Sequence, residues 1–258
     1  MNVKTFKEYK ELGVIPDILF WVGCAGSYDD RAKKITKSLI NLFNKSGISF
    51  GILGVEESCS GDPAKRAGNE FLFQMQALSN IEVLNSYQVK KIVTACPHCF
   101  NTIKNEYPEL GGIYEVIHHS QLIDQLINDG KLKIKDDQLN GKKITFHDPC
   151  YLGRANGEYY APRQVIRALR ADLKEMKSCK EKAMCCGAGG AQMFKDSEKG
   201  NKEINIKRTE EAIETKSNII AAACPFCNTM LTDGIKSLEN NKEIQVKDIS
   251  ELIDKVTD

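Results

Sequence analysis

The feature that most constrains this chain is the spacing of its cysteines, because the spacing repeats. Nine of the ten cysteines fall into two sets that follow one another in the same order. The leading members correspond at a shift of 126 positions, Cys24 with Cys150 and Cys59 with Cys185. Self-similarity of this kind indicates an internal duplication, so the two halves of the chain are expected to fold alike.

Each set ends in a Cys-Pro-x-Cys segment, at 96–99 in the first half and at 224–227 in the second. Within the cysteine pattern the two halves differ at one position. Ser60 stands where the second half has Cys186, and a glycine follows in both. We therefore interpret the two sets as one site built twice, with a thiol lost from the first copy. Cys179 lies outside the pattern and is interpreted as a bystander.

Charge and hydropathy exclude several classes of protein. The 258 residues carry 36 basic and 35 acidic side chains, a balance that does not favour nucleic-acid binding. No apolar run approaches the roughly 20 residues of a transmembrane helix. The apolar run at 18–24 is too short for a secretory signal, and acidic residues precede it. We expect a cytoplasmic protein, and clustered cysteines in a reducing compartment indicate metal ligation or redox chemistry.

The segments around the cysteines repeat as well, with strands and helices alternating. Strands are predicted at 17–22, 48–53, 91–95 and 114–117, and again at 144–147, 173–176, 219–223 and 243–247. Helices are predicted at 31–43, 70–89, from Pro97 and at 121–127, and again at 162–169, 204–215, from Pro225 and at 250–254. This order predicts an α/β fold of two tandem domains, each a mostly parallel sheet flanked by helices. The polar stretch 131–143 places the junction between domains 1–135 and 136–258.

The predicted strand ends bring the cysteines together. Four of them lie at or just beyond the carboxyl end of a predicted strand, namely Cys24, Cys96, Cys150 and Cys224. In open α/β sheets this edge holds the functional crevice. A Cys-x-x-Cys segment at a helix start also exposes its thiols to the positive end of the helix dipole, which lowers their pKa. Thiolate sets of this kind bind zinc or iron–sulfur clusters.

The complete second motif, with its adjacent cysteines and glycine at 185–187, resembles the CCG cysteine-rich domain. This domain occurs in pairs in the catalytic subunit of heterodisulfide reductase and in the iron–sulfur subunits of lactate and glycolate oxidation systems. The segments DPCYLGR (148–154) and CCGAGG (185–190) are most similar to iron–sulfur oxidoreductases linked to electron-transferring flavoproteins and quinone pools. The resemblance covers almost the whole chain.

The resemblance implies a noncubane [4Fe–4S] cluster in the second half, with five ligands: Cys150, Cys185, Cys186, Cys224 and Cys227. In the first half four thiolates remain, those of Cys24, Cys59, Cys96 and Cys99. Four thiolates suit a cubane [4Fe–4S] cluster and equally a closed zinc site, and both alternatives stay open here. A Ser60 alkoxide is a poorer fifth ligand, since a hydroxyl resists deprotonation more than a thiol does.

Other polar residues are weaker candidates. His147 and Asp148 lie close to Cys150 in sequence and could donate protons or hydrogen-bond cluster sulfurs; a structural histidine at a strand end is the alternative. Arg66, Arg154 and Arg163 could bind an anionic substrate, but isolated arginines are usually surface residues.

The resemblance implies an iron–sulfur electron-transfer subunit of an oxidoreductase complex. The chain has no flavin, nicotinamide or Cys-x-x-Cys-x-x-Cys ferredoxin motif. We therefore expect a ferredoxin-type iron–sulfur subunit or a flavoprotein as partner, which can itself be attached to a membrane. The alternative is a metal-stabilised interaction module without redox turnover. That alternative explains four thiolates but not five, because one zinc ion binds four ligands.

Overall fold

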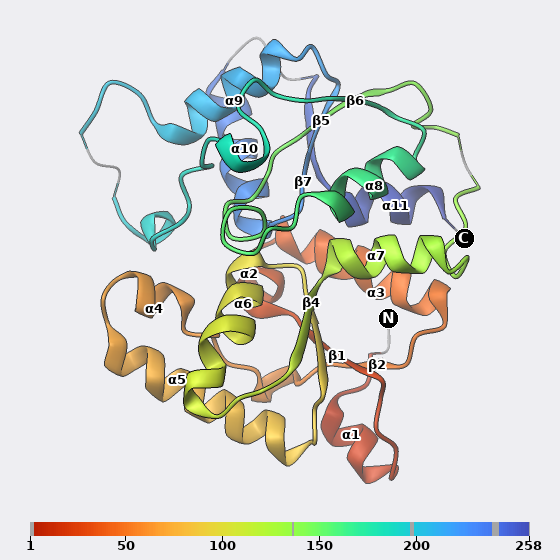
Figure 1. Ribbon diagram of the computed structural model, residues 1–258, viewed down its shortest axis with the longest axis vertical. Helices are drawn as coiled ribbons and strands as arrows, with labels where there is room; N and C mark the ends of the chain where they lie inside the picture. The colour runs from red at the N-terminus through yellow and green to blue at the C-terminus, as the bar shows by residue number, and fades with distance from the viewer. Residues whose placement is uncertain (1–2, 136, 197–198, 239–242, 258) are drawn as a thin grey trace.

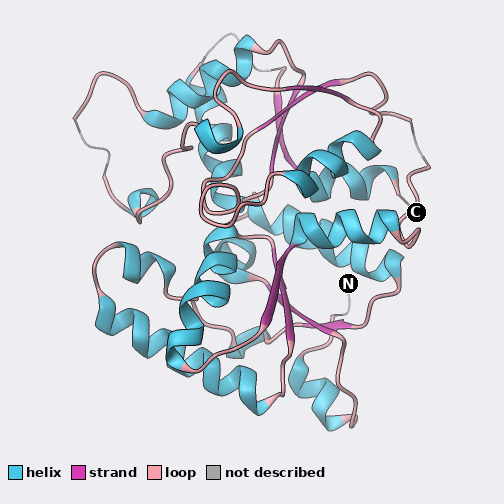
Figure 2. Cartoon of the chain, in the orientation of Figure 1, coloured by secondary structure: helices cyan, strands magenta, loops and turns pink. Residues whose placement is uncertain are grey.

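Two four-stranded, all-parallel sheets form the framework of the protein (Figures 1 and 2). The computed structural model describes residues 3–135, 137–196, 199–238 and 243–257. The first sheet has the order β2-β1-β3-β4, with β1 at Ile18–Trp21, β2 at Phe50–Gly51, β3 at Lys91–Thr94 and β4 at Glu115–His118. The second has the order β6-β5-β7-β8, with β5 at Lys143–Phe146, β6 at Asp172–Lys174, β7 at Ile219–Ala222 and β8 at Gln245–Asp248. The prediction of a duplicated α/β fold is confirmed.

Seven α-helices belong to the described part of the first half. They are α1 (Phe6–Glu11), α2 (Gly23–Tyr28), α3 (Ala32–Ser46), α4 (Asp62–Arg66), α5 (Glu70–Ser86), α6 (Pro97–Asn101) and α7 (His119–Asn128). The sequence predicted α3, α5, α6 and α7. It missed α1, α2 and α4, because helices of five or six residues are too short to display an apolar period. The equally short α6 was predicted from the proline at its first position.

The described part of the second half contains four α-helices, and each was predicted. They are α8 (Tyr160–Ala168), α9 (Ile204–Glu214), α10 (Pro225–Ser237) and α11 (Ile249–Val256). The start of α11 is a capping box, in which Asp248 accepts from the backbone of Ser250 and Glu251 accepts from the backbone of Asp248. This reciprocal cap satisfies N–H groups that a helix start leaves free.

Two central strands, β1 and β7, are buried along their whole length, which explains their continuous apolar runs. All four residues of β1 and all four residues of β7 are buried. Helices cover both faces of parallel sheets, so such strands do not alternate between apolar and polar residues. Strand β6 lies at the edge of the second sheet and is only half-buried.

The two halves pack against each other through two pairs of helices. Helix α3 of the first half packs on α11 of the second, and α7 of the first packs on α8 of the second (Figure 1). Polar contacts support this interface: Arg31 pairs with Glu251 at 2.6 Å, and His119 Nε2 lies 3.0 Å from Asp248 Oδ1. His119 and Asp248 are fully buried. The interface therefore fixes how the two sheets, and the cysteines at their ends, face one another.

Among the described residues, none of the helices combines the length and the apolar character needed to cross a bilayer.

Candidate metal centres

Both cysteine sets lie where the strand order of their sheet reverses. The chain leaves β1 toward β2 on one side and leaves β3 toward β4 on the other, and Cys24 and Cys96 follow these two central strands. In the second sheet Cys150 follows β5 and Cys224 follows β7 in the same way. Loops that diverge at such a switch point leave a crevice at the carboxyl ends of the strands. The fold thus brings each set to the site that the sequence indicated.

In the first half four thiols converge on one small space. Cys24 lies within hydrogen-bonding range of Cys59, and Cys96 within range of Cys99. Cys96 and Cys99 are buried, whereas Cys24 and Cys59 are half-buried. Gly23, at φ +75°, leaves room beside the sulfurs, since a Cβ there would lie 3.5 Å from Cys99 Sγ. The backbone turn into α2 can therefore approach the thiols closely.

Ser60 still faces this set, although it has lost the thiol of its counterpart. Its side chain is buried, and its Oγ donates a hydrogen bond to Cys99 Sγ at 3.4 Å. The Tyr107 hydroxyl donates to the carbonyl oxygen of Ser60 at 3.1 Å and so helps to hold the segment in place. Ser60 acts as a hydrogen-bond donor to sulfur in this structure.

In the second half five thiols converge. Cys150 contacts Cys185, Cys185 contacts Cys186, and Cys224 contacts Cys227. The thiol of Cys227 donates to Cys186 Sγ at 3.2 Å, which joins the adjacent cysteines to the start of α10. Cys186, Cys224 and Cys227 are buried, and Cys150 and Cys185 are half-buried. All five cysteines assigned to the complete motif therefore share one site.

The protonation of these thiols indicates what the sites can bind. The neighbouring Cys59 thiol raises the pKa of Cys24, and Cys24 in turn lowers the pKa of Cys59 to about 7. Cys185 raises the pKa of Cys150 in the same way, and the pKa of Cys185 is lowered by Cys150 and further by Cys186. A lone thiolate is therefore stabilised by neighbouring thiols that keep their protons. Ionising a whole set in a buried site requires compensating positive charge, which a metal centre supplies.

Backbone N–H groups add to this stabilisation in equivalent places. Gly61 N–H donates to Cys59 Sγ at 3.5 Å, and Gly187 N–H donates to Cys185 Sγ at 3.2 Å. Both glycines have positive φ, +89° and +93°, which L-residues with a side chain adopt at a cost. In each half, the glycine two positions after the second cysteine of the set therefore orients a donor at the sulfur.

Asp148 takes part in a buried ion pair. Its two oxygens accept from Arg163 at 2.8 and 3.0 Å, and Oδ2 also accepts from the backbone N–H of Lys180. Arg163 binds Glu175 on its other edge at 2.7 Å. The expectation of a surface position was wrong for Arg163, because two carboxylates compensate the charge of its guanidinium inside the protein.

His147 faces the second thiol set. Its Nδ1 accepts a hydrogen bond from Arg208 Nε at 3.0 Å, and its Nε2 has no partner among the described residues. A nitrogen of this ring and the sulfurs of Cys186 and Cys227 all lie within 4.8 Å of one another. Burial and the charge of Arg208 lower the pKa of His147 to about 3, so the imidazole is neutral.

Sequence reasoning missed His98, which joins the two sites. His98 Nδ1 lies 3.0 Å from Asp62 Oδ2, and its ring packs on Tyr151 and Phe226 of the second half, with centroids 4.5 and 5.6 Å away. Burial opposes protonation of His98, but Asp62 and the thiolate of Cys224 raise its pKa. His98 and Phe226 hold the same place in the two Cys-Pro-x-Cys segments, yet their contact depends on how the halves pack.

The first site opens to the surface through two pockets. A pocket of about 330 Å³ is lined by Cys24, Tyr28, Met193, Phe194 and Phe226. A second, of about 390 Å³, is lined by Cys59, Pro63, Leu72 and Phe194. Each half-buried cysteine of the first set thus reaches an apolar opening.

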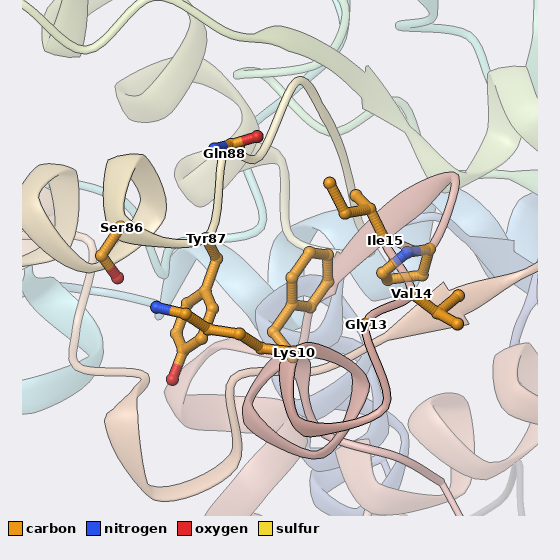
Figure 3. Close-up of a pocket in the computed structure, with 9 residues that line it drawn as sticks. Lys10, Gly13, Val14, Ile15, Ser86, Tyr87 and Gln88 are labelled. Atoms are coloured by element: carbon orange, nitrogen blue, oxygen red, sulfur yellow. The ribbon is translucent and has the colours of Figure 1, made fainter.

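A further pocket lies at the opposite edge of the first sheet (Figure 3). It measures about 230 Å³ and is lined by residues before β1, such as Val14 and Ile15, and before β3, such as Tyr87. These segments enter the sheet at the amino ends of its strands, and no cysteine lines the pocket. It therefore does not belong to the site.

Two equivalent thiol sets at the switch points of duplicated parallel sheets define a cysteine-rich α/β protein. The family model of the CCG cysteine-rich domain matches residues 18–104 and 144–232. The chain belongs to this family, in agreement with the resemblance of its motifs.

Named relatives carry the same region. The EtfAB:quinone oxidoreductase of Syntrophomonas wolfei is 43% identical over 243 residues, which cover 92% of this chain and 34% of the relative. The probable iron-sulfur-binding oxidoreductase FadF of Bacillus subtilis is 45% identical, over 98% of this chain and 36% of its own length. One subunit of the dihydromethanophenazine:CoB–CoM heterodisulfide reductase of Methanosarcina barkeri is 36% identical, over 92% of this chain and 58% of its own length. The chain thus spans about a third of the first two relatives.

Proposed function

We propose that this chain is an iron–sulfur electron-transfer subunit of an oxidoreductase complex, with a noncubane [4Fe–4S] cluster in its second half. The observation that carries the proposal is the convergence of five thiols, with Cys186 and Cys227 in contact at 3.2 Å. Five thiolates exceed the four ligands of a structural zinc site. Cysteine thiolates are the usual ligands of iron–sulfur clusters. The names of the relatives support the same class of chemistry.

We propose a four-cysteine [4Fe–4S] cluster in the first half, held by Cys24, Cys59, Cys96 and Cys99. Ser60 donates a hydrogen bond to Cys99 and does not need to ionise, which supports a four-ligand site. Zinc remains the competing occupant, because a closed set of four thiolates is also its structural coordination.

When bound, such clusters supply one-electron redox chemistry. The protein's own residues arrange a path for it. Cys24 and Cys59 reach surface pockets, which favours the first site as the point of exchange with a partner. The Cys224 thiolate lies close enough to Cys96 and His98 to raise their pKa, so the two sites are neighbours across the interface. With clusters held at both sets, the first set would lie between the surface pockets and the second set, an arrangement suited to electron transfer with a partner.

The partner proposed is a ferredoxin-type iron–sulfur polypeptide or a flavoprotein, which can be attached to a membrane, and the complex is expected to face the cytoplasm. Two observations support a partner. The first two relatives are about three times as long as this chain, so they contain polypeptide beyond the shared region. One of them is named as an oxidoreductase that links EtfAB to quinone.

Metal analysis of anaerobically prepared protein tests the proposal. Each cluster should contribute about four iron and four sulfide per chain, with a brown colour and a paramagnetic signal in one redox state. Cys224→Ser should lower the iron and sulfide content, whereas Cys179→Ser, outside the pattern, should leave it unchanged. Zinc without acid-labile sulfide would overturn the redox proposal in favour of a metal-stabilised interaction module.

A further inference from the structure

Two of the buried N–H groups that lack an acceptor among the described residues occupy equivalent places. They are Trp21 Nε1 and His147 Nε2, and both are inaccessible to solvent. Trp21 ends β1, and His147 directly follows β5. The two residues are 126 positions apart, as Cys24 and Cys150 are, and each stands three positions before the first cysteine of its set.

Both groups can act only as donors. The indole nitrogen of tryptophan has no lone pair to offer, so it donates or stays unpaired. In His147 the Nδ1 atom accepts from Arg208 Nε, which places the ring proton on Nε2. His147 therefore presents an N–H group rather than a metal-ligating lone pair.

Each ring lies near the thiol set of its half. A nitrogen of the imidazole lies within 4.8 Å of both Cys186 Sγ and Cys227 Sγ. In the first half, Gly23 lies close to both the indole and a thiol. A Cβ built on Gly23 would lie 4.0 Å from Trp21 Nε1 and 3.5 Å from Cys99 Sγ. The absence of a side chain at Gly23 leaves this space between the indole and the thiols. A buried donor without an acceptor costs its full desolvation penalty, so two equivalent cases call for an acceptor.

We propose that Trp21 Nε1–H and His147 Nε2–H are positioning donors that each hydrogen-bond to a sulfur of the metal centre bound in their half of the chain. The acceptor is a cysteine Sγ or an inorganic sulfide, and Arg208 fixes the tautomer in the second half. The inference rests on the proposed function, because it requires a metal centre at each set. Hydrogen bonds to cluster sulfurs stabilise the more negative, reduced state and so raise the reduction potential.

The second site is tested on the whole chain, with its clusters, by titrating the midpoint potential with paramagnetic resonance. His147→Phe removes the donor and should shift the midpoint of the second cluster to a more negative potential. His147→Gln offers an amide oxygen to Arg208 and an amide N–H to sulfur, so it should restore most of the shift. Equal iron content in all three proteins, with the same midpoint, would overturn the inference while leaving the proposed function intact.

The unaltered protein provides a measurement that does not depend on variants folding. Its reduced clusters should show hyperfine coupling to an exchangeable proton, which disappears in deuterium oxide. Trp21 is the only tryptophan of the chain, so indole labelled with nitrogen-15 reports on this residue alone. Coupling between that nitrogen and the first cluster is expected, and it should be lost in Trp21→Phe.

The outcomes separate the two hypotheses. Protein that binds no iron and sulfide contradicts the proposed function itself. Protein that binds both clusters but shows neither the nitrogen coupling nor a shifted midpoint contradicts only the donor role. If the first set binds zinc, cadmium substitution replaces the hyperfine measurement. A scalar coupling between cadmium and the indole proton would then support the inference, and its absence would overturn it for Trp21.

Discussion

Ser60 Oγ lies 3.4 Å from Cys99 Sγ and donates a hydrogen bond to it. The equivalent pair in the second half is Cys186 and Cys227, whose sulfurs lie 3.2 Å apart. The two halves thus differ in one atom, an oxygen in Ser60 and a sulfur in Cys186, but both keep the contact with the last cysteine of the set. This makes Cys186→Ser a test of the fifth thiolate that should not disturb the fold.

In Cys186→Ser the second site should resemble the first. We expect the protein to fold, since a serine at this place can donate to Cys227 as Ser60 donates to Cys99. The paramagnetic resonance spectrum of the second cluster should change, and redox activity should fall strongly, because the noncubane arrangement needs a thiolate beyond four. Cys179→Ser is the matched control. An unchanged spectrum and iron content in Cys186→Ser would show that Cys186 is not a ligand.

Gly61→Ala should destabilise the protein through a steric clash beside the first site. A Cβ at Gly61 would lie 2.7 Å from the ring of Phe73, and the backbone there has φ +89°. We expect a loss of about 2–4 kcal/mol in the free energy of unfolding from overpacking and backbone strain together. Gly68→Ala, at φ +85° but in open space, should cost only about 1–2 kcal/mol. Denaturant unfolding of both variants measures the difference, and equal losses would exclude a role for Phe73.

Arg163→Met should leave Asp148 as an uncompensated buried charge. Because the Arg163 and Asp148 side chains are almost fully buried, we expect a loss of about 3–5 kcal/mol in the free energy of unfolding. The exposed pair of Arg170 and Asp137 is the control, and Arg170→Met should cost less than about 1 kcal/mol. Similar losses in both variants would mean that burial does not set the strength of the Arg163 pair.

His118 should make the protein less stable as the pH falls. Burial and the neighbouring His119 hold the pKa of His118 well below its usual range, so the folded chain keeps this ring neutral. The unfolded chain takes up a proton there near pH 6.5. The contribution of His118 to stability is therefore complete above that pH and decreases below it, by up to about 1.4 kcal/mol per pH unit. His118→Gln should reduce the slope of unfolding free energy against pH between 6 and 5. A slope equal to that of the unaltered protein would show that His118 titrates alike in both states.

The sequence by itself determined the duplication, the order of the strands and of most helices, and the placement of most cysteines. These are local properties: a buried parallel strand appears as an apolar run, and the residue after it lies at the carboxyl edge of the sheet. That is why Cys96 and Cys224 could be placed at strand ends before the structure was known. The short helices α1, α2 and α4 could not be predicted, because five or six residues show no period.

Only the tertiary structure decided which side chains from distant segments contact one another. Arg163 is buried because Asp148 and Glu175 meet it from separate segments, and no local pattern records that meeting. His98 contacts Phe226 because α3 and α7 pack on α11 and α8, which depends on the complementarity of surfaces far apart in the chain. Trp21 appears in the sequence as one more apolar residue of a buried strand. Its N–H group becomes a donor without an acceptor only when burial removes water, since the need for an acceptor arises from the environment of the atom.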